Sequence, residues 1–309
     1  MHLQHGTTSI YPTTLSATTK EIKGAINAFK TAKERMKKRA NLAGMHLEGP
    51  YFAMNQRGGQ DPHTIRNPDP AEYVPIIEMA EGAISRWSSA PELPGALQLG
   101  DYLVKNGILA AIAHTDATID QVREAIRHGY THITHLYSCT STITRRSGFR
   151  IPGVTEAAYI FDELTVEVIA DGCHLPPDML KMVVKCKGTD NVSLVTDSLY
   201  AAGLPGKTVR LGGECDGREG IVEDGVVKLP DRSAFAGSIA TTDRLVRTMW
   251  KGAGVSLPDA VRMMTENPAK LMKIDDRKGR LLPGRDADIV LFDEYVNVKQ
   301  VYYAGERVY

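Results

Sequence analysis

The sequence predicts an α/β fold: a (β/α)8 TIM-type barrel with a small β-sandwich that the C-terminus partly forms. Short β-rich runs alternate with helical patterns along most of the 309 residues, which is typical of a parallel sheet with right-handed crossovers. Polar side chains that could bind a ligand stand at the C-terminal ends of at least five of these runs, where a barrel gathers its active site. An open doubly wound sheet would also fit the alternation, but no glycine-rich phosphate loop follows the first strand, which favours the barrel.

Seven runs are expected to form the parallel strands. In chain order they are Thr8–Tyr11, Ala43–Leu47, Ile84–Ser88, Leu109–Ala113, Ile133–Leu136, Thr165–Ile169 and Val192–Val195. A closed barrel of this type needs eight strands. The chain opens with His5-Gly6-Thr7-Thr8, which reads as the end of a helix leading into a strand. We therefore expect the first βα unit of the barrel to be absent.

Helical patterns follow most of these strands. Lys20–Arg39 carries apolar side chains at helical spacing. Asp120–His128 opens on an aspartate that can cap its first turn. Pro177–Cys186 and Thr241–Gly252 fit the same scheme. Asn267-Pro268 offers a later helix start, with the asparagine as the cap and the proline in the first turn.

Two segments are expected to lie outside the barrel. Val209–Ser233 should form a β insertion around residues 207–235, because it carries three hairpin signals. These signals are Gly212-Gly213, Asp216-Gly217 and Asp224-Gly225. Gly279–Tyr309 is rich in β-forming residues and should supply part of the sandwich. We therefore expect a barrel domain over residues 1–278 and the C-terminal part of a sandwich domain over residues 279–309.

Composition excludes several classes of protein. Lys plus Arg equals Asp plus Glu, so the zero net charge indicates neither a nucleic-acid partner nor an acidic tail. The four cysteines form no CxxC pair, which is typical of a reduced, cytoplasmic protein without a zinc knuckle. No apolar run reaches the roughly 18 residues of a membrane span, and the N-terminus lacks the features of a signal peptide.

Three side chains at strand ends predict a metal centre. Glu48 ends the run Ala43–Leu47 before Gly-Pro, His114 closes the run Leu109–Ala113, and His135 lies in Thr131-His132-Ile133-Thr134-His135. Taken alone, Glu48 could be an acidic residue in a surface turn, and a single histidine at a strand end more often has a structural role. As a set, one carboxylate and two imidazoles with a position left for water match a catalytic site for zinc or a similar ion. His132 is expected to be structural, because residues three apart on a strand face opposite sides.

Two further groups complete the candidate site. Asp197 ends the last strand in Leu194-Val195-Thr196-Asp197, where a carboxylate is well placed to act as general base. His174 follows Thr165–Ile169 in the motif ADGCH. Each has a structural alternative: Asp197 could be a helix N-cap, and His174 could cap the helix that Pro176-Pro177 begins.

These motifs together carry a family resemblance. In this order HLEGPYF, AHTDA, THITHLY, ADGCH, LVTDS, FAGS and ENPAKLM resemble the N-acetylglucosamine-6-phosphate deacetylases, a family of amidohydrolases, from Gly6 to the end of the chain. The resemblance implies a divalent metal, Zn2+ or alternatively Fe2+, Mn2+ or Co2+, held by Glu48, His114 and His135, with Asp197 as the catalytic acid–base. It implies a homodimer in which Arg146 can reach the neighbouring site. The residues that it implies around the sugar phosphate are Gly59, Gln60, Ser138, Cys139, Arg146, His174, Phe235, Ala236 and Gly237.

The sequence departs from the family pattern in several places. The family's first barrel strand, which carries an HxH pair, and the front half of its sandwich have no counterpart here. Ser138-Cys139-Thr140 replaces the usual Asn-Ala-Met, Gln60 stands where many members have His, and Arg145–Arg150 replaces a shorter basic loop. These differences concern recognition of the sugar more than the chemistry, so another N-acetylated amino sugar stays open as the substrate.

The expected reaction is hydrolysis of the N-acetyl group to acetate and the amino sugar phosphate, without a covalent intermediate. A thiol nucleophile at Cys173 is disfavoured, because adjacent side chains at a strand end diverge. Two rivals stay open. One is another amidohydrolase reaction, such as opening of a cyclic amide, although no lysine ends a strand here. The other is a truncated, inactive barrel protein.

Overall fold

The structure is a computed structural model that describes residues 1–36, 41–204, 206–212 and 217–309. The chain forms two compact units. The N-terminal unit comprises Tyr11–Arg35 and Leu42–Val166, and the C-terminal unit comprises Met1–Ile10, Met36–Asn41 and Glu167–Tyr309. Each unit is described by itself.

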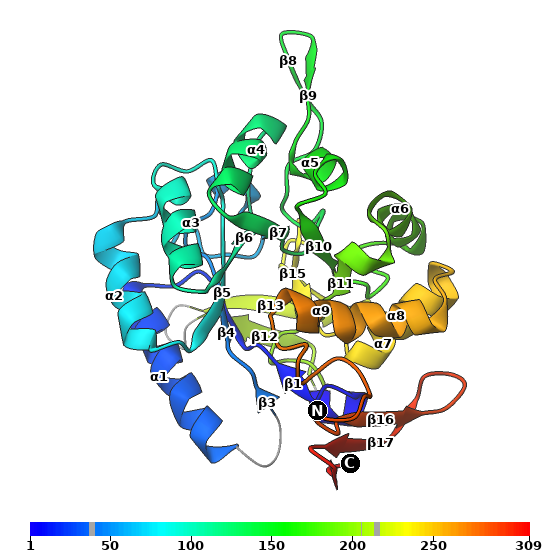
Figure 1. The fold of residues 1–309 in the computed structure, drawn as a ribbon. Coiled ribbons are helices and arrows are strands. Elements are labelled where there is room, and N and C mark those ends of the chain that lie inside the picture. The colour runs from blue at the N-terminus through cyan, green and yellow to red at the C-terminus, as the bar shows by residue number, and fades with distance from the viewer. Residues whose placement is uncertain (37–40, 205, 213–216) are drawn as a thin grey trace. The chain divides into compact units, whose positions relative to one another are not determined.

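A parallel sheet forms the centre of the N-terminal unit (Figure 1). Its strands lie side by side in the order β2 (Thr13–Thr14), β4 (Met45–Glu48), β5 (Ile84–Ser89), β6 (Leu109–Ile112), β7 (Tyr130–Ile133) and β10 (Thr165–Val168). Each neighbouring pair is parallel. The carboxyl ends of these strands therefore share one edge of the sheet.

Helices cover this sheet as the βα alternation predicts. They are α1 (Thr19–Arg35), α2 (Pro70–Ala80), α3 (Ala96–Lys105), α4 (Ile119–Arg127) and α5 (Val154–Ile160). The strands are buried on both faces, as in parallel sheets covered by helices, and all four residues of β4 are buried. Trp87 of β5 is fully buried and stacks on Tyr51 at 5.6 Å between ring centroids, while α3 buries Leu99 and Leu103.

The C-terminal unit combines helices with antiparallel sheets. The end of β10 lies beside β11 (Val192–Leu194), where Val195 N donates to Val168 O at 3.1 Å. The β insertion is a four-stranded sheet of β12 (Thr208–Leu211), β13 (Arg218–Glu223), β14 (Val226–Lys228) and β15 (Phe235–Ser238). The C-terminal sheet contains β16 (Ile289–Phe292), β17 (Val298–Tyr303) and β18 (Glu306–Arg307). The α/β class and the antiparallel C-terminal sheet are thus confirmed.

The remaining elements complete the chain. The helices of the C-terminal unit are α6 (Pro177–Lys187), α7 (Thr242–Arg247), the π-helical turn η4 (Thr248–Gly252), α8 (Leu257–Met264) and α9 (Glu266–Leu271). The short elements are η1 (His2–His5), β1 (Ser9–Ile10), β3 (Asn41–Leu42), η2 (Met54–Gln56), β8 (Thr144–Arg146), β9 (Phe149–Ile151) and η3 (Thr189–Asn191). Among the described residues, none of the helices has the length and apolar character that crossing a membrane requires.

The structure corrects two strand predictions. The first expected strand divides in two: Ser9–Ile10 pairs with β3, and the strand of the parallel sheet is the later Thr13–Thr14. The strand expected at Ile133–Leu136 instead spans Tyr130–Ile133, because the backbone turns at His135, whose φ is 30°.

The structure also corrects two helix starts. Helix α4 is capped by Thr118, which forms a capping box with Gln121, and not by Asp120. Asn267 lies inside α9 instead of capping it, and its Nδ2 donates to the carbonyls of Thr189 and Val192. The last residues expected for the first helix, Lys37–Arg39, and parts of two hairpin signals, Gly213 and Asp216, lie outside the described residues. The third signal holds, since Asp224 and Gly225 connect β13 to β14.

Candidate metal centre

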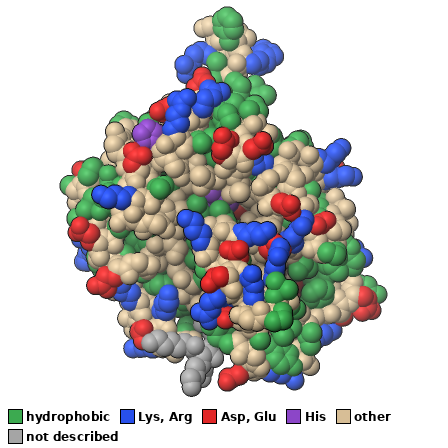
Figure 2. All heavy atoms as spheres, in the orientation of Figure 1, with side chains coloured by type: hydrophobic (Ala, Val, Ile, Leu, Met, Phe, Trp, Pro, Cys, Tyr) green, Lys and Arg blue, Asp and Glu red, His purple; other side chains and the backbone are tan. Residues whose placement is uncertain are grey.

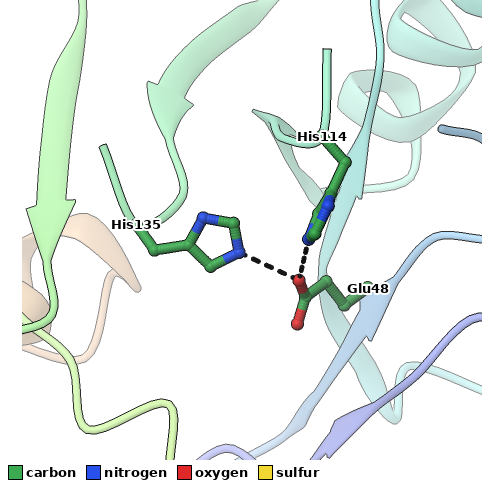
Figure 3. Close-up of side chains that lie close together, drawn as sticks. All are labelled: Glu48, His114 and His135. Atoms are coloured by element: carbon green, nitrogen blue, oxygen red, sulfur yellow. Dashed lines mark hydrogen bonds and ion pairs between the residues drawn. The ribbon is translucent and has the colours of Figure 1, made fainter. Parts of the chain in front are cut away.

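The ends of three strands of the N-terminal unit bring Glu48, His114 and His135 together (Figure 3). Glu48 is the last residue of β4, His114 follows β6 by two residues, and His135 follows β7 by two residues. One ligand atom from each lies within 4.8 Å of the others, and all three side chains are buried. Because β4, β6 and β7 end at the same edge of one parallel sheet, their terminal side chains converge.

Both histidines of this cluster face one oxygen of Glu48. His114 Nε2 lies 2.9 Å from Glu48 Oε1, and His135 Nε2 lies 3.0 Å from the same oxygen. The two imidazole rings meet edge to face, with centroids 5.0 Å apart and planes at 86°. The Phe52 ring packs on the His114 ring at 4.4 Å. Two nitrogens and one carboxylate oxygen thus point at a common small volume.

The arrangement of Glu48, His114 and His135 requires positive charge, from protons or a cation, between the carboxylate and the two imidazoles. Burial opposes ionisation of Glu48, but hydrogen bonds from His114 and His135 hold its pKa well below the usual range. Burial disfavours a charged His114, but its hydrogen bonds with Cys139 and Glu48 raise the pKa of this histidine to about 10. A nitrogen lone pair and a carboxylate oxygen repel each other at these distances, so protons or a cation must lie between them. One divalent cation can replace two protons, and the His2Glu donor set is one that catalytic zinc uses. The residues present therefore fit a divalent metal.

The two predicted histidine ligands and the predicted acid–base residue share an unusual backbone conformation. The φ angles of His114, His135 and Asp197 are 46°, 30° and 46°. Residues other than glycine rarely adopt this left-handed region, and such conformations cluster at functional sites. At each position the left-handed residue follows the end of a strand, so it sets the direction in which the chain leaves the sheet.

Part of the expected sugar-binding set lies around the cluster. Ser138 and Cys139 follow His135, where Ser138 N donates to His135 O at 2.8 Å. Cys139 Sγ packs against Gly58, so that a Cβ at Gly58 would lie 2.6 Å from the sulfur and 3.8 Å from His114 Cε1. Gly59 is half-buried beside this contact in sequence. The Gln60 side chain is buried, and its Oε1 accepts a hydrogen bond from Ser16 N at 2.7 Å, so its oxygen has a structural partner.

Other candidates lie in the C-terminal unit. His174 Nδ1 lies 2.7 Å from Asp171 Oδ2, and the His174 ring meets the Phe235 ring edge to face at 4.9 Å. Helix α6 begins at Pro177 without a side-chain cap, so His174 does not cap it. Ala236 and Gly237 follow Phe235 in β15.

The Asp197 carboxylate is not the N-cap of a helix. Ser238 N donates to Asp197 O at 3.3 Å, and the next described element after β11 is the strand β12. The Asp197 backbone therefore lies in the connection that follows β11 and leads to β12.

Arg146 is not among the buried side chains. It lies on β8, which forms an exposed hairpin with β9 through a turn at Ser147 and Gly148. In Figure 1 this hairpin extends beyond helices α4 and α5 of the same unit, and Figure 2 shows basic side chains on it together with apolar ones. Phe149 on this hairpin is 73% exposed.

His132 has contacts that fit the structural role expected for it, whereas one contact of His114 was not expected from the sequence. His132 is buried, and its Nδ1 lies 2.8 Å from Thr165 Oγ1 of the neighbouring strand, in keeping with a structural role. The sequence did not predict the contact between the backbone carbonyl of Gln56 and His114 Nδ1, which lie 2.7 Å apart. No residue pattern signals it, because any residue carries a carbonyl.

Comparison with known proteins shows the family. The sequence matches the model of the Amidohydrolase family over residues 1–308. It is 34% identical over 294 residues to the N-acetylglucosamine-6-phosphate deacetylase of Bacillus subtilis, covering 93% of this chain and 71% of that protein. It is 30% identical to the N-acetylgalactosamine-6-phosphate deacetylase of Escherichia coli O157:H7, covering 98% and 78%.

Solved structures agree with these relatives. A complex of the Mycobacterium smegmatis N-acetyl-D-glucosamine-6-phosphate deacetylase with N-acetyl-D-glucosamine-6-phosphate matches with a TM-score of 0.91 at 32% identity, covering 99% of this chain and 78% of that one. The Thermotoga maritima enzyme of the same name matches with a TM-score of 0.90 at 30% identity, covering 99% and 80%. The chain belongs to the amidohydrolase family and groups there with the N-acetylglucosamine-6-phosphate deacetylases.

Proposed function

We propose that this protein hydrolyses the N-acetyl group of N-acetylglucosamine 6-phosphate, giving glucosamine 6-phosphate and acetate. The observation that carries the proposal is the convergence of His114 Nε2 and His135 Nε2 on one oxygen of Glu48, in a chain about one third identical to deacetylases. Relatives that act on N-acetylgalactosamine 6-phosphate make the galacto epimer the second candidate substrate.

In this proposal Glu48, His114 and His135 hold one divalent ion, Zn2+ in the first instance and Fe2+, Mn2+ or Co2+ as alternatives. When bound, such an ion supplies Lewis acidity that activates water and polarises a carbonyl. Asp197 accepts a proton from the attacking water as the new C–O bond forms at the acetyl carbon. It returns a proton to the amide nitrogen as the C–N bond breaks, so that the amino sugar leaves as a neutral amine.

The remaining predicted residues would bind the sugar phosphate. The set is Gly59, Gln60, Ser138, Cys139, Arg146, His174, Phe235, Ala236 and Gly237. We further propose that the protein acts as a cytoplasmic homodimer that binds neither nucleic acid nor membrane. The free thiols of Cys139, Cys173 and Cys186 are consistent with a reducing compartment. Cys215 lies outside the described residues. Residues 1–278 and 279–309 remain our proposed domains.

Acetate release tests the function directly. The purified protein, loaded with Zn2+, Fe2+, Mn2+ or Co2+ in turn, is incubated with N-acetylglucosamine 6-phosphate, its galacto epimer and a cyclic amide. We expect acetate and a free amine in equal amounts from the first substrate, and loss of the reaction after chelation. A protein that binds metal but opens only the cyclic amide would be a different amidohydrolase, and one without metal or turnover would be an inactive barrel protein.

Substitution of Arg146 tests phosphate recognition. A guanidinium on an exposed hairpin can donate two hydrogen bonds to a phosphate of a neighbouring copy. Because a charged hydrogen bond contributes about 1.5–3 kcal/mol, Arg146→Ala should raise KM for the phosphorylated sugar by roughly 10- to 100-fold and change kcat little. Arg145→Ala is the matched control, since Arg145 is the preceding residue of β8 and faces the other side of the hairpin. Equal effects of both variants, or a preference for the sugar without phosphate, would contradict the assignment.

A further inference from the structure

The loop after β4 folds back over His114 and fixes both its backbone and its ring. Ala53 N donates to His114 O at 2.9 Å. The carbonyl oxygen of Gln56, the last residue of η2, lies 2.7 Å from His114 Nδ1. A carbonyl can only accept a hydrogen bond, so Nδ1 carries the hydrogen. The other ring nitrogen, Nε2, is the one that faces Glu48.

The side chain of Gln56 ties this carbonyl to the loop that carries His114. Gln56 Nε2 donates to Asp116 Oδ1 at 2.7 Å. Asp116 lies two residues after His114, and its own backbone N donates to Glu92 Oε1 at 2.7 Å. Glu92 Oε2 also accepts from Thr115 Oγ1 at 2.6 Å. Gln56 is therefore bound at both ends to the segment His114–Asp116, and Glu92 holds that segment from the loop after β5.

The Phe52 ring packs against the His114 ring at 4.4 Å between centroids and so restrains its orientation. Phe52 thus restrains the position of the His114 ring, whereas the Gln56 carbonyl fixes a hydrogen on its Nδ1. A neutral imidazole can carry its hydrogen on either nitrogen, and only the form protonated at Nδ1 offers a lone pair at Nε2. Partners of this kind around metal-binding histidines fix the tautomer and change metal affinity by about 10- to 100-fold when removed.

We propose that Gln56 and Asp116 are positioning residues of the metal centre, whose hydrogen bond holds the Gln56 carbonyl against His114 Nδ1 and so keeps His114 Nε2 available for the ion. This inference rests on the ligand set of the proposed function. Neither side chain belongs to the cluster of potential ligands. Their role is to keep a hydrogen on His114 Nδ1 and the ring in one orientation, so that Nε2 faces the ion.

A double-mutant cycle on metal affinity tests the proposal. The apoprotein competes with a chromophoric chelator for Zn2+ or Co2+, so no substrate or turnover is involved. We expect Gln56→Ala and Asp116→Ala each to weaken binding about 10-fold, and the double variant to bind as weakly as either single variant, because both changes break the same bond. Asp116→Asn should bind like the wild type, because its amide oxygen still accepts from Gln56. Asp101→Ala removes a comparable exposed hydrogen bond, from His128 Nδ1 at 2.9 Å, and should leave affinity unchanged.

A second measurement detects the hydrogen on His114 Nδ1 directly. Long-range 1H–15N spectra of the apoprotein should show the His114 ring with a hydrogen fixed on Nδ1 in the wild type and in Asp116→Asn. The two alanine variants should show loss of this fixed state. Wild-type affinity and an unchanged His114 signal in both alanine variants would overturn the positioning role, as would additive effects in the double variant. The His114→Ala variant distinguishes failure of the positioning role from failure of the proposed ligand set. If that variant keeps full metal affinity, the ligand set itself is wrong.

Discussion

The His135→Ala variant is expected to carry almost no metal and to release almost no acetate. In the proposed site the ion has three protein ligands, and removal of one leaves two that cannot fix its geometry. The transition state depends on the ion for several kcal/mol, so turnover should fall by roughly 10³-fold or more. Metal content after gel filtration and acetate release from the same sample measure both effects.

His132→Ala is the matched control for this variant. His132 is also a buried histidine of the same segment, but its Nδ1 contacts Thr165 Oγ1 of the neighbouring strand. We expect this control to lower the melting temperature and to keep the metal. Circular dichroism on both variants distinguishes loss of the ion from loss of the fold. Full metal occupancy in His135→Ala would show that the ion is held elsewhere.

The Asp197→Asn variant should keep its fold and its metal and lose most of its activity. The amide has the size and shape of the carboxylate, but it cannot accept the proton of the attacking water. Loss of one acid–base group typically costs about 10²- to 10⁴-fold in kcat. The same loss should appear in kcat/KM, because the interaction is made in the transition state. Steady-state rates, metal content and melting temperature are measured on one preparation.

Asp190→Asn makes the same chemical change at the other end of the same strand. Asp190 precedes β11, is exposed and pairs with Arg262 at 2.9 Å, so its replacement should leave kcat within about twofold, as surface ion pairs contribute about 0–1 kcal/mol. A structural role for Asp197 would instead lower the melting temperature and leave the rate nearly unchanged. That outcome would remove Asp197 from the mechanism.

The sequence predicted the parallel strands because a strand that is buried on both faces is a nearly continuous apolar run. Continuous apolar runs such as Leu109–Ala113 stand out between polar turns, and the observed strand ends only one residue earlier, at Ile112. The convergence of Glu48, His114 and His135 was predictable for the same reason: residues at the carboxyl ends of parallel strands meet at one edge.

What the sequence did not reveal depends on backbone conformation. The strand containing His132 was placed three residues too late, because nothing in Thr134-His135-Leu136 indicates a left-handed turn at a histidine. Two other features had usable signals. Thr118 and Gln121 form a capping box that marks the start of α4, and the pair Ser147-Gly148 suits the tight turn between β8 and β9.

The left-handed conformation of His114, His135 and Asp197 has a consequence for protein engineering. A glycine at such a position would relieve roughly 1–2 kcal/mol of steric strain per residue, so a search for thermostable variants by random mutagenesis would tend to find these sites. Each gain in melting temperature there would delete a group on which the proposed chemistry depends. Stability and activity therefore oppose each other at these three positions, and selection for heat resistance alone should drive the protein toward a well-folded but inactive form.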